Sequence, residues 1–296
     1  MTEPARTDTG TIYDIGYQHY DGARLGRPYA IWSLFVHGLG TVFAIGRGLR
    51  AGLIPLVLGA AAILPAAFQA LATAYTDGMV ELFTYSNYFI NVSIVFAFFC
   101  ASRAPELMSA DQRTHTLVLY FARALHRGDY VLAKVLALVT GVLFLTVTPL
   151  LILFAGHVFS TTDLWAAFLD EAHALAPILG SSLVMALMMG TVSAAIASLT
   201  PRRSLAAAAV LGYFMISRVL AEILTDSINA TWVSWMDLVD PFIALGGFAD
   251  WIFGTGQALS QYLGPDVPGW RFGMACLLYT LAGVSLLVAR YAKVAT

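Results

Sequence analysis

Six apolar segments, each about 20 residues long, restrict the fold more than any other feature of this sequence. They cover residues 51–75, 82–102, 131–156, 175–199, 204–224 and 272–289. A helix of about 20 apolar residues crosses the hydrocarbon core of a bilayer, which is about 30 Å thick. Open strands are excluded there, because lipid would leave their N–H and C=O groups unpaired. The sequence therefore predicts an all-α polytopic membrane protein with six transmembrane helices.

The composition favours the same class of protein. Of the 296 residues, 59% are hydrophobic and 11% are charged, whereas soluble domains are about 25% charged. So few charges cannot cover the surface of a water-soluble protein. The high apolar content also excludes intrinsic disorder. The net charge of −2 gives no reason to expect nucleic acid as a partner.

The basic residues lie on one side of the six segments. All 16 Lys and Arg residues except Arg218 and Arg271 lie before the first segment, between the second and third, at the start of the third, between the fourth and fifth, or after the sixth. The other connections carry acidic residues. Because loops rich in Lys and Arg stay in the cytoplasm, both termini are expected there.

Two further apolar stretches are unsuited to crossing a bilayer alone. Tyr29–Ile45 is short for a span and is expected to lie in the cytoplasmic interface as a connecting helix. Its expected lipid-facing residues are Trp32, Phe35, Leu39, Val42 and Phe43. The region 231–269 contains acidic residues, prolines and glycines, so helices such as Pro241–Phe253 are expected to re-enter the outer interface. Residues 1–50 then form a cytoplasmic segment and residues 51–296 the transmembrane domain.

Polar residues inside the apolar segments are the first candidates for a function. Arg218 and Glu222 are four residues apart, so they share a helical face and are expected to pair. Charge in lipid is costly, and such residues face a bundle interior or a water-filled path. They either line a transport path or hold two helices or two subunits together. Asn87 and Asn91 likewise share a face, where they line a polar path or join helices by hydrogen bonds.

No motif in the sequence predicts catalysis, a cofactor or a metal. A phosphate-binding loop and a His-Glu-x-x-His motif are both absent from it. A serine nucleophile at Ser181 or Ser182 with His173 as its base is conceivable. The favoured interpretation is that the two serines are small residues that let helices pack closely. His157 and His173 near Glu171 are read as loop residues rather than as metal ligands. The chain is therefore not expected to be an enzyme.

The connection between the second and third segments, residues 103–130, carries the most specific pattern. It joins an acidic start, a Thr-x-Thr-Leu-x-Leu core, an Arg-Ala-Leu-x-Arg-x-Asp-Tyr turn and a basic entry to the next segment, at Pro105-Glu106, Thr114–Leu119, Arg123–Tyr130 and Ala133-Lys134. This pattern resembles the coupling loop of ABC-2-type permeases, which have the type V exporter fold. The stretch Ile12–Arg27 also looks like the start of an actinobacterial-like subset of that family. A plain amphipathic interface helix is the alternative reading of the loop.

The resemblance implies how the parts of the chain would work. It implies a permease subunit of an ATP-driven exporter in the bacterial cytoplasmic membrane, whose partners are a separate ATP-binding subunit and a second permease copy or paralogue. ATP and Mg would bind to the partner subunit, and no cofactor is expected in this chain. Residues expected to couple to that ATPase are Glu106, Asp111, Arg113, Arg123, Arg127, Asp129 and Tyr130. Residues expected near the substrate path, between the permeases, are Asn87, Asn91, Arg218 and Glu222.

Two other functions remain open from the residues alone. A membrane-embedded hydrolase or transferase would need a nucleophile, a base and an oxyanion donor that converge, and no such motif is evident. An ion-driven secondary transporter often shows paired repeats and acidic residues at mid-membrane, and neither is evident. The substrate itself is not encoded in any motif, although an apolar path with few polar groups suits an amphipathic or hydrophobic molecule.

Overall fold

The computed structural model describes residues 25–46, 48–76, 82–121, 125–227, 238–255 and 268–293, together with Gly22 and Met79. Within these ranges all regular structure is helical. The elements in order are α1 (Arg27–Val42), α2 (Leu49–Tyr75), α3 (Tyr85–Arg113), α4 (Leu117–Phe121), α5 (Arg127–Val158), α6 (Leu164–Glu171), the 3-10 turn η1 (Ala172–Ala174), α7 (Leu175–Ala197), α8 (Arg203–Ser227), α9 (Pro241–Phe253) and α11 (Trp270–Ala292).

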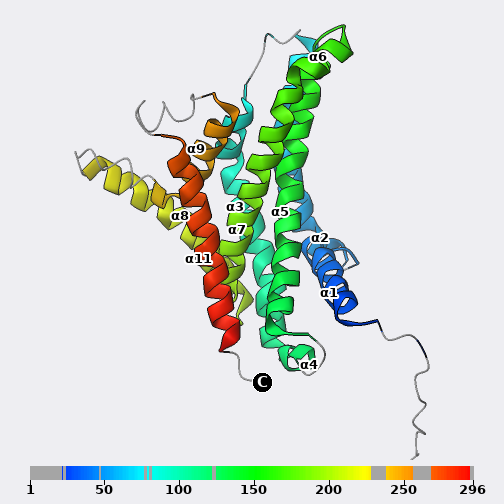
Figure 1. Cartoon of the computed structure of the whole chain (residues 1–296), viewed down its shortest axis with the longest axis vertical. Coiled ribbons are helices and arrows are strands. Elements are labelled where there is room, and N and C mark those ends of the chain that lie inside the picture. Colours follow the sequence, from blue (N-terminus) through cyan, green and yellow to red (C-terminus); the bar gives the residue numbers. More distant parts are fainter. Residues whose placement is uncertain are drawn as a thin grey trace, which may run out of the picture.

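The predicted all-α membrane architecture is confirmed. In the described part of the chain, five helices are long and apolar enough to cross a membrane. A sixth candidate is α3, whose two segments, Tyr85–Asn91 and Ser93–Arg113, meet at a bend of 55° and are long and apolar enough to cross only when they are taken together. The second predicted span ended at residue 102, but α3 continues to Arg113. The long helices stand side by side, with α5 and α7 near the centre (Figure 1).

The bend in α3 has a local cause in polar side chains. Ser93 Oγ donates a hydrogen bond to the carbonyl oxygen of Ile90 at 2.7 Å, and Asn91 Nδ2 donates to that of Asn87 at 2.8 Å. Side chains that bind carbonyls of the preceding turn bend helices at such points. The bent part packs against α9, where a methyl group at Gly246 would lie 2.5 Å from Cδ1 of Ile90.

Small residues let the long helices approach closely. A methyl group at Gly156 of α5 would lie 2.5 Å from Cα of Ala70 in α2. A methyl group at Gly283 of α11 would lie 2.9 Å from the backbone of Thr191 in α7. Because lipid offers no hydrophobic drive for helix association, such close van der Waals packing is a main stabilising term in membrane bundles.

The helix α1 lies against the bundle and packs chiefly on α5. The prediction of which of its residues face lipid is wrong for Val42. Trp32 is 60% exposed, as expected for a lipid-facing residue. Val42 was expected to face lipid, but it is fully buried and fills the space that a side chain at Gly141 of α5 would need. Apolar residues suit lipid and protein interior equally, so hydropathy alone does not separate the two faces of α1.

The helix α8 differs from the other long helices in its direction. It packs mainly on α3, leans strongly away from the bundle, and its C-terminal end stands apart from it (yellow in Figure 1). Its exposed apolar residues include Ile216, Val219, Leu220 and Ile223. A large apolar surface of α8 is therefore left uncovered by this chain.

The region 231–269 is described in part. The predicted short helix Pro241–Phe253 is confirmed as α9, capped by the Asp240 carboxylate, which accepts a hydrogen bond from the N–H of Phe242 at 2.9 Å. The remainder of 231–269, apart from 238–255 and 268–269, lies outside the described residues, as does most of the motif Ile12–Arg27.

Substituting Gly156 by Ala is expected to destabilise the bundle, because the added methyl group meets the α2 backbone. Overpacking of this kind costs about 1–3 kcal/mol. The matched control is Gly212→Ala in α8, where a methyl group meets nothing within 4 Å. Thermal unfolding in detergent micelles should show a lower Tm for Gly156→Ala and no loss for Gly212→Ala. Equal Tm values for the two variants would contradict the close contact of α2 with α5.

Candidate functional site

One end of the bundle gathers basic residues, and we call it the basic end. There the C-terminal ends of α3, α7 and α11 meet α4 and the N-terminal ends of α5 and α8, at the bottom of Figure 1. Its described basic residues outside α1 are Arg103, Arg113, Arg127, Lys134, Arg202, Arg203, Arg290 and Lys293. Most of the residues predicted to couple to another protein lie at this end.

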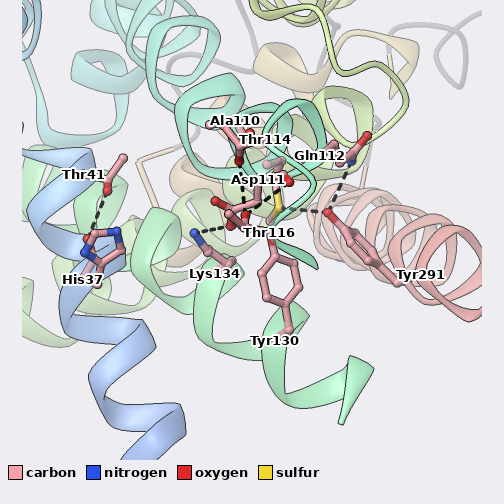
Figure 2. Close-up of polar contacts among 11 residues, drawn as sticks. His37, Thr41, Ala110, Asp111, Gln112, Thr114, Thr116, Tyr130, Lys134 and Tyr291 are labelled. Carbon is pink, nitrogen blue, oxygen red and sulfur yellow. Dashed lines mark hydrogen bonds and ion pairs between the residues drawn. The ribbon is translucent and has the colours of Figure 1, made fainter. Parts of the chain in front are cut away.

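A buried ion pair forms the centre of the basic end (Figure 2). Lys134 Nζ of α5 lies 2.8 Å from Oδ2 of Asp111 in α3, and the Lys134 side chain is only 3% exposed. Tyr130 donates its hydroxyl hydrogen to the same Oδ2 at 2.8 Å. The ammonium also lies 5.6 Å from the centre of the Tyr130 ring. A buried ammonium needs such a counter-charge and hydrogen bonds, since its desolvation is costly.

The part of α3 beyond the predicted span, residues 103–113, is called the tail of α3, and it also binds the C-terminal end of α7. Ser109 Oγ donates to the carbonyl oxygen of Ala197 at 2.9 Å, and Gln112 Nε2 donates to that of Ser198 at 2.8 Å. These carbonyls at a helix C-terminus have no partner within their own helix. Tyr291 of α11 completes the packing, with its ring 5.5 Å from that of Tyr130. The tail of α3 therefore joins α5, α7 and α11.

Two further ion pairs join peripheral helices to this end. Arg27 of α1 binds both carboxylate oxygens of Asp129, at 2.8 and 2.7 Å. Asp129 also accepts a hydrogen bond from the His126 N–H at 3.0 Å as part of a capping box at the start of α5. The hydrogen bonds that Arg27 donates to the Asp129 carboxylate raise the pKa of the Arg27 guanidinium. Glu106 of α3 lies 2.6 Å from Arg203 of α8.

The short helix α4 projects from this network with an exposed apolar side. It follows a turn in which His115 has a φ of +55° and Thr116 Oγ1 donates to the Asp111 carbonyl oxygen at 3.3 Å. Leu117 is buried beneath the helix, whereas Val118 and Leu119 are 57% and 68% exposed. Burial, reinforced by the Asp111 carboxylate, raises the pKa of the Tyr120 hydroxyl in the same helix. The helix α4 thus presents two apolar side chains outward from a fixed base.

The segment 103–130, predicted as a coupling loop, is mostly helical. The helix α3 runs to Arg113 and α5 begins at Arg127, so the described connection consists of a turn at 114–116, α4 and residues 125–126. The helix persists because Glu106, Asp111 and neighbouring polar residues bind other helices instead of water.

The predicted coupling residues differ in their contacts and exposure. Glu106, Asp111, Asp129 and Tyr130 are engaged in the internal contacts described above. Arg113 is exposed at the end of α3. Arg127 donates from Nη1 to the Ala292 carbonyl oxygen of α11 at 2.9 Å. Arg123 lies outside the described residues.

The predicted path residues lie on α3 and α8, and the expected ion pair is not formed. Arg218 and Glu222 are both exposed, and they are not among the ion pairs of the described residues. Asn91 is exposed and bonded to the carbonyl of Asn87 in its own helix. No hydrogen bond of the described residues joins these asparagines to Arg218 or Glu222.

The opposite end of the bundle contains a smaller polar cluster. Tyr85 of α3 donates its hydroxyl hydrogen to Oε1 of Glu171 at 2.6 Å, and its oxygen lies 2.8 Å from Nδ1 of His157. His157 is therefore packed between helices rather than placed in a solvated loop, which corrects the sequence-based reading. Among the described residues, no group of three or more His, Cys, Asp or Glu side chains is placed to hold a metal.

The serines of α7 and the nearby His173 make separate contacts. Ser181 donates to the carbonyl oxygen of Pro177 at 2.7 Å, and the buried Ser182 Oγ has no hydrogen-bond partner among the described residues. Nδ1 of His173 lies 2.6 Å from the carbonyl oxygen of Asp170.

The sequence predicts Asp111 and Tyr130 as coupling residues, but it does not identify their contact with Lys134. Lys134 stands in it only among the basic residues of one side and at the basic entry of the coupling pattern, although a lysine inside an apolar run is itself a signal of a buried partner. Gln112 and Tyr291 carry no comparable signal, because their roles depend on which helix ends meet.

Comparison of the chain with models of protein families and with curated proteins finds no match.

Removing one member of the central ion pair is expected to be more harmful than removing both. Lys134→Met leaves the Asp111 carboxylate largely buried without its cation, which costs about 3–5 kcal/mol. The double variant Lys134→Met/Asp111→Leu replaces both charges with apolar groups and should recover most of that loss. Unfolding of both single variants and the double variant in detergent gives the coupling energy. A double variant as unstable as the sum of the two single variants would contradict the direct interaction.

Proposed function

We propose that the chain is the transmembrane permease subunit of an ATP-driven ABC-2-type exporter in a bacterial cytoplasmic membrane. The proposal is supported by the resemblance of residues 103–134 to the coupling region of that family and by the order of the apolar helices. In this reading the basic end faces the cytoplasm, because Lys and Arg mark cytoplasmic loops. A separate subunit binds ATP and Mg, and the permease moves an amphipathic or hydrophobic substrate.

The observation that carries the proposal is the exposed α4 at the basic end. Val118 and Leu119 form a small apolar surface that projects from polar surroundings, and partner contacts are built around such anchors. In the proposed complex, α4 inserts into the ATP-binding subunit and Arg113 contacts its rim. Asp111 and Tyr130 have a different role from the one first expected, because they hold α4 against α5 and transmit its displacement.

The proposed substrate path runs along α8 between two permease subunits. Arg218 and Glu222 are exposed on α8, where the neighbouring exposed residues Ile216, Val219, Leu220 and Ile223 are apolar. Lipid is a costly environment for them, so a second copy or a paralogue is expected to cover this face. An apolar groove of about 540 Å³, lined by α2, α3 and α8, adjoins it near the basic end.

Placing charges on α4 is expected to abolish binding of the ATP-binding subunit. The variant Val118→Glu/Leu119→Glu changes two exposed side chains, so the bundle itself should remain folded. For the test, stand-alone ATPases with a phosphate-binding loop are sought among the neighbouring genes, co-expressed with this chain and purified through a tag on the permease. We expect at least a tenfold loss of co-purified ATPase, equivalent to about 1.4 kcal/mol.

The matched control for that test is Leu169→Glu in α6, at the opposite end of the bundle. Leu169 is 56% exposed, close to the 68% of Leu119. It should leave co-purification unchanged. If the α4 variant retained full binding, or if Leu169→Glu reduced binding equally, α4 would not be the docking element.

Cysteine cross-linking tests the second permease. Both native cysteines, Cys100 and Cys276, are buried. Val219→Cys on α8 should form a disulfide-linked dimer in membranes, whereas Leu132→Cys on α5, which is similarly exposed at 52% against 55%, should not. A dimer formed equally by both variants would reflect random collision and would contradict the assignment of α8 to the interface.

A further inference from the structure

A second groove lies at the basic end, between α5 and α11, away from α8. Its volume is about 450 Å³. Its walls are mainly aliphatic side chains, with the aromatic Tyr291 among them; the aliphatic residues are Val131, Leu132, Val135, Val284, Leu287 and Val288. Nearly all the surface that it offers is therefore apolar, and its occupant within a membrane must be apolar over most of its length.

The mouth of this groove is cationic. Arg127, in the first turn of α5, lines the groove and donates one hydrogen bond from Nη1 to the Ala292 carbonyl oxygen at 2.9 Å. A guanidinium has five N–H donors, so most of its donors remain for another acceptor. Lys293 is exposed directly after Ala292. None of the residues that line the groove is acidic, and nearby Asp129 is already paired with Arg27.

Gly128 keeps the mouth of the groove open. It lines the groove beside Arg127, and a methyl group built on it meets nothing within 4 Å. A headgroup can therefore approach the backbone at the start of α5 without a steric clash. The hydrogen bond to Ala292 holds the Arg127 side chain across the mouth, between the two helices that form the walls.

We propose that this groove binds an anionic phospholipid, with an acyl chain between α5 and α11 and the phosphate against Arg127. Charge complementarity selects this occupant, because one molecule must combine a long aliphatic chain with an anion at its end. Basic pockets between transmembrane helices bind anionic lipid headgroups in this way. The apolar walls would contribute little to binding a soluble anion. The proposal does not depend on the function proposed above.

The site gives Arg127 a role different from contact with an ATPase. The bound phosphate would lie against the same guanidinium that bridges α5 and the last residues of α11. Lipid binding would therefore stabilise the junction of these two helices, and purified protein stripped of anionic lipid should unfold at a lower temperature.

Lipid titration of the purified full-length chain tests the proposal by native mass spectrometry. The two probes are phosphatidylglycerol and phosphatidylcholine with identical acyl chains. The unsubstituted chain should bind phosphatidylglycerol several-fold more tightly than phosphatidylcholine. Arg127→Gln should weaken phosphatidylglycerol binding about fivefold, the contribution of one basic residue near a membrane surface. It should leave phosphatidylcholine binding nearly unchanged.

Two variants separate the groove from general surface charge. Gly128→Leu fills the open mouth without removing a charge, and it should reduce the binding of phosphatidylglycerol and its thermal stabilisation of the protein. Arg113→Gln removes an exposed basic residue at the same end but outside the groove, and it should retain wild-type binding. Equal affinity for both lipids, or an equal loss in Arg113→Gln and Arg127→Gln, would overturn the proposal. Full binding by Gly128→Leu would also overturn it.

Discussion

The buried pair between Asp111 and Lys134 is the interaction on which the basic end depends. An apolar helix that contains a lysine must either expose it to water or provide an anion, because the cost of an unpaired buried ammonium is several kcal/mol. The tail of α3 provides that anion. Once α3 extends that far, Ser109 and Gln112 reach the end of α7, and Asp111 accepts a hydrogen bond from Tyr130. The position of α4 follows from this extension.

The same extension separates two roles that look alike in the sequence. Acidic and aromatic residues of segment 103–130 stabilise contacts between helices, whereas Val118, Leu119 and Arg113 remain exposed. A partner at the basic end would therefore contact the exposed apolar residues Val118 and Leu119 of α4, which the polar contacts of Asp111 hold in place. Arg127 belongs to neither group, because it bridges α5 and α11 at the mouth of an apolar groove.

The helix α8 leaves a large apolar surface uncovered by its own chain. It leans away from the bundle (Figure 1) and exposes Arg218 and Glu222 among apolar residues. Two charges that neither pair with each other nor suit lipid are unfavourable in an isolated subunit. The proposed second permease explains that exposure, since it would enclose the charges and the adjoining apolar surface.

Hydropathy and charge along the sequence were enough to predict the all-α membrane class, the approximate positions of the long apolar helices and the concentration of basic residues at one end. These properties can be read along the chain, because the thickness of the bilayer sets the length of an apolar helix that crosses it. The distribution of Lys and Arg among the loops likewise indicates which loops lie on the same side. Four features follow from how the helices pack together: the burial of Val42, the pairing of Lys134 with Asp111, the bend and extension of α3, and the absence of an ion pair between Arg218 and Glu222 among the described residues. The reason is that lipid and protein interior are equally apolar, so hydropathy does not specify which face of a helix meets which neighbour.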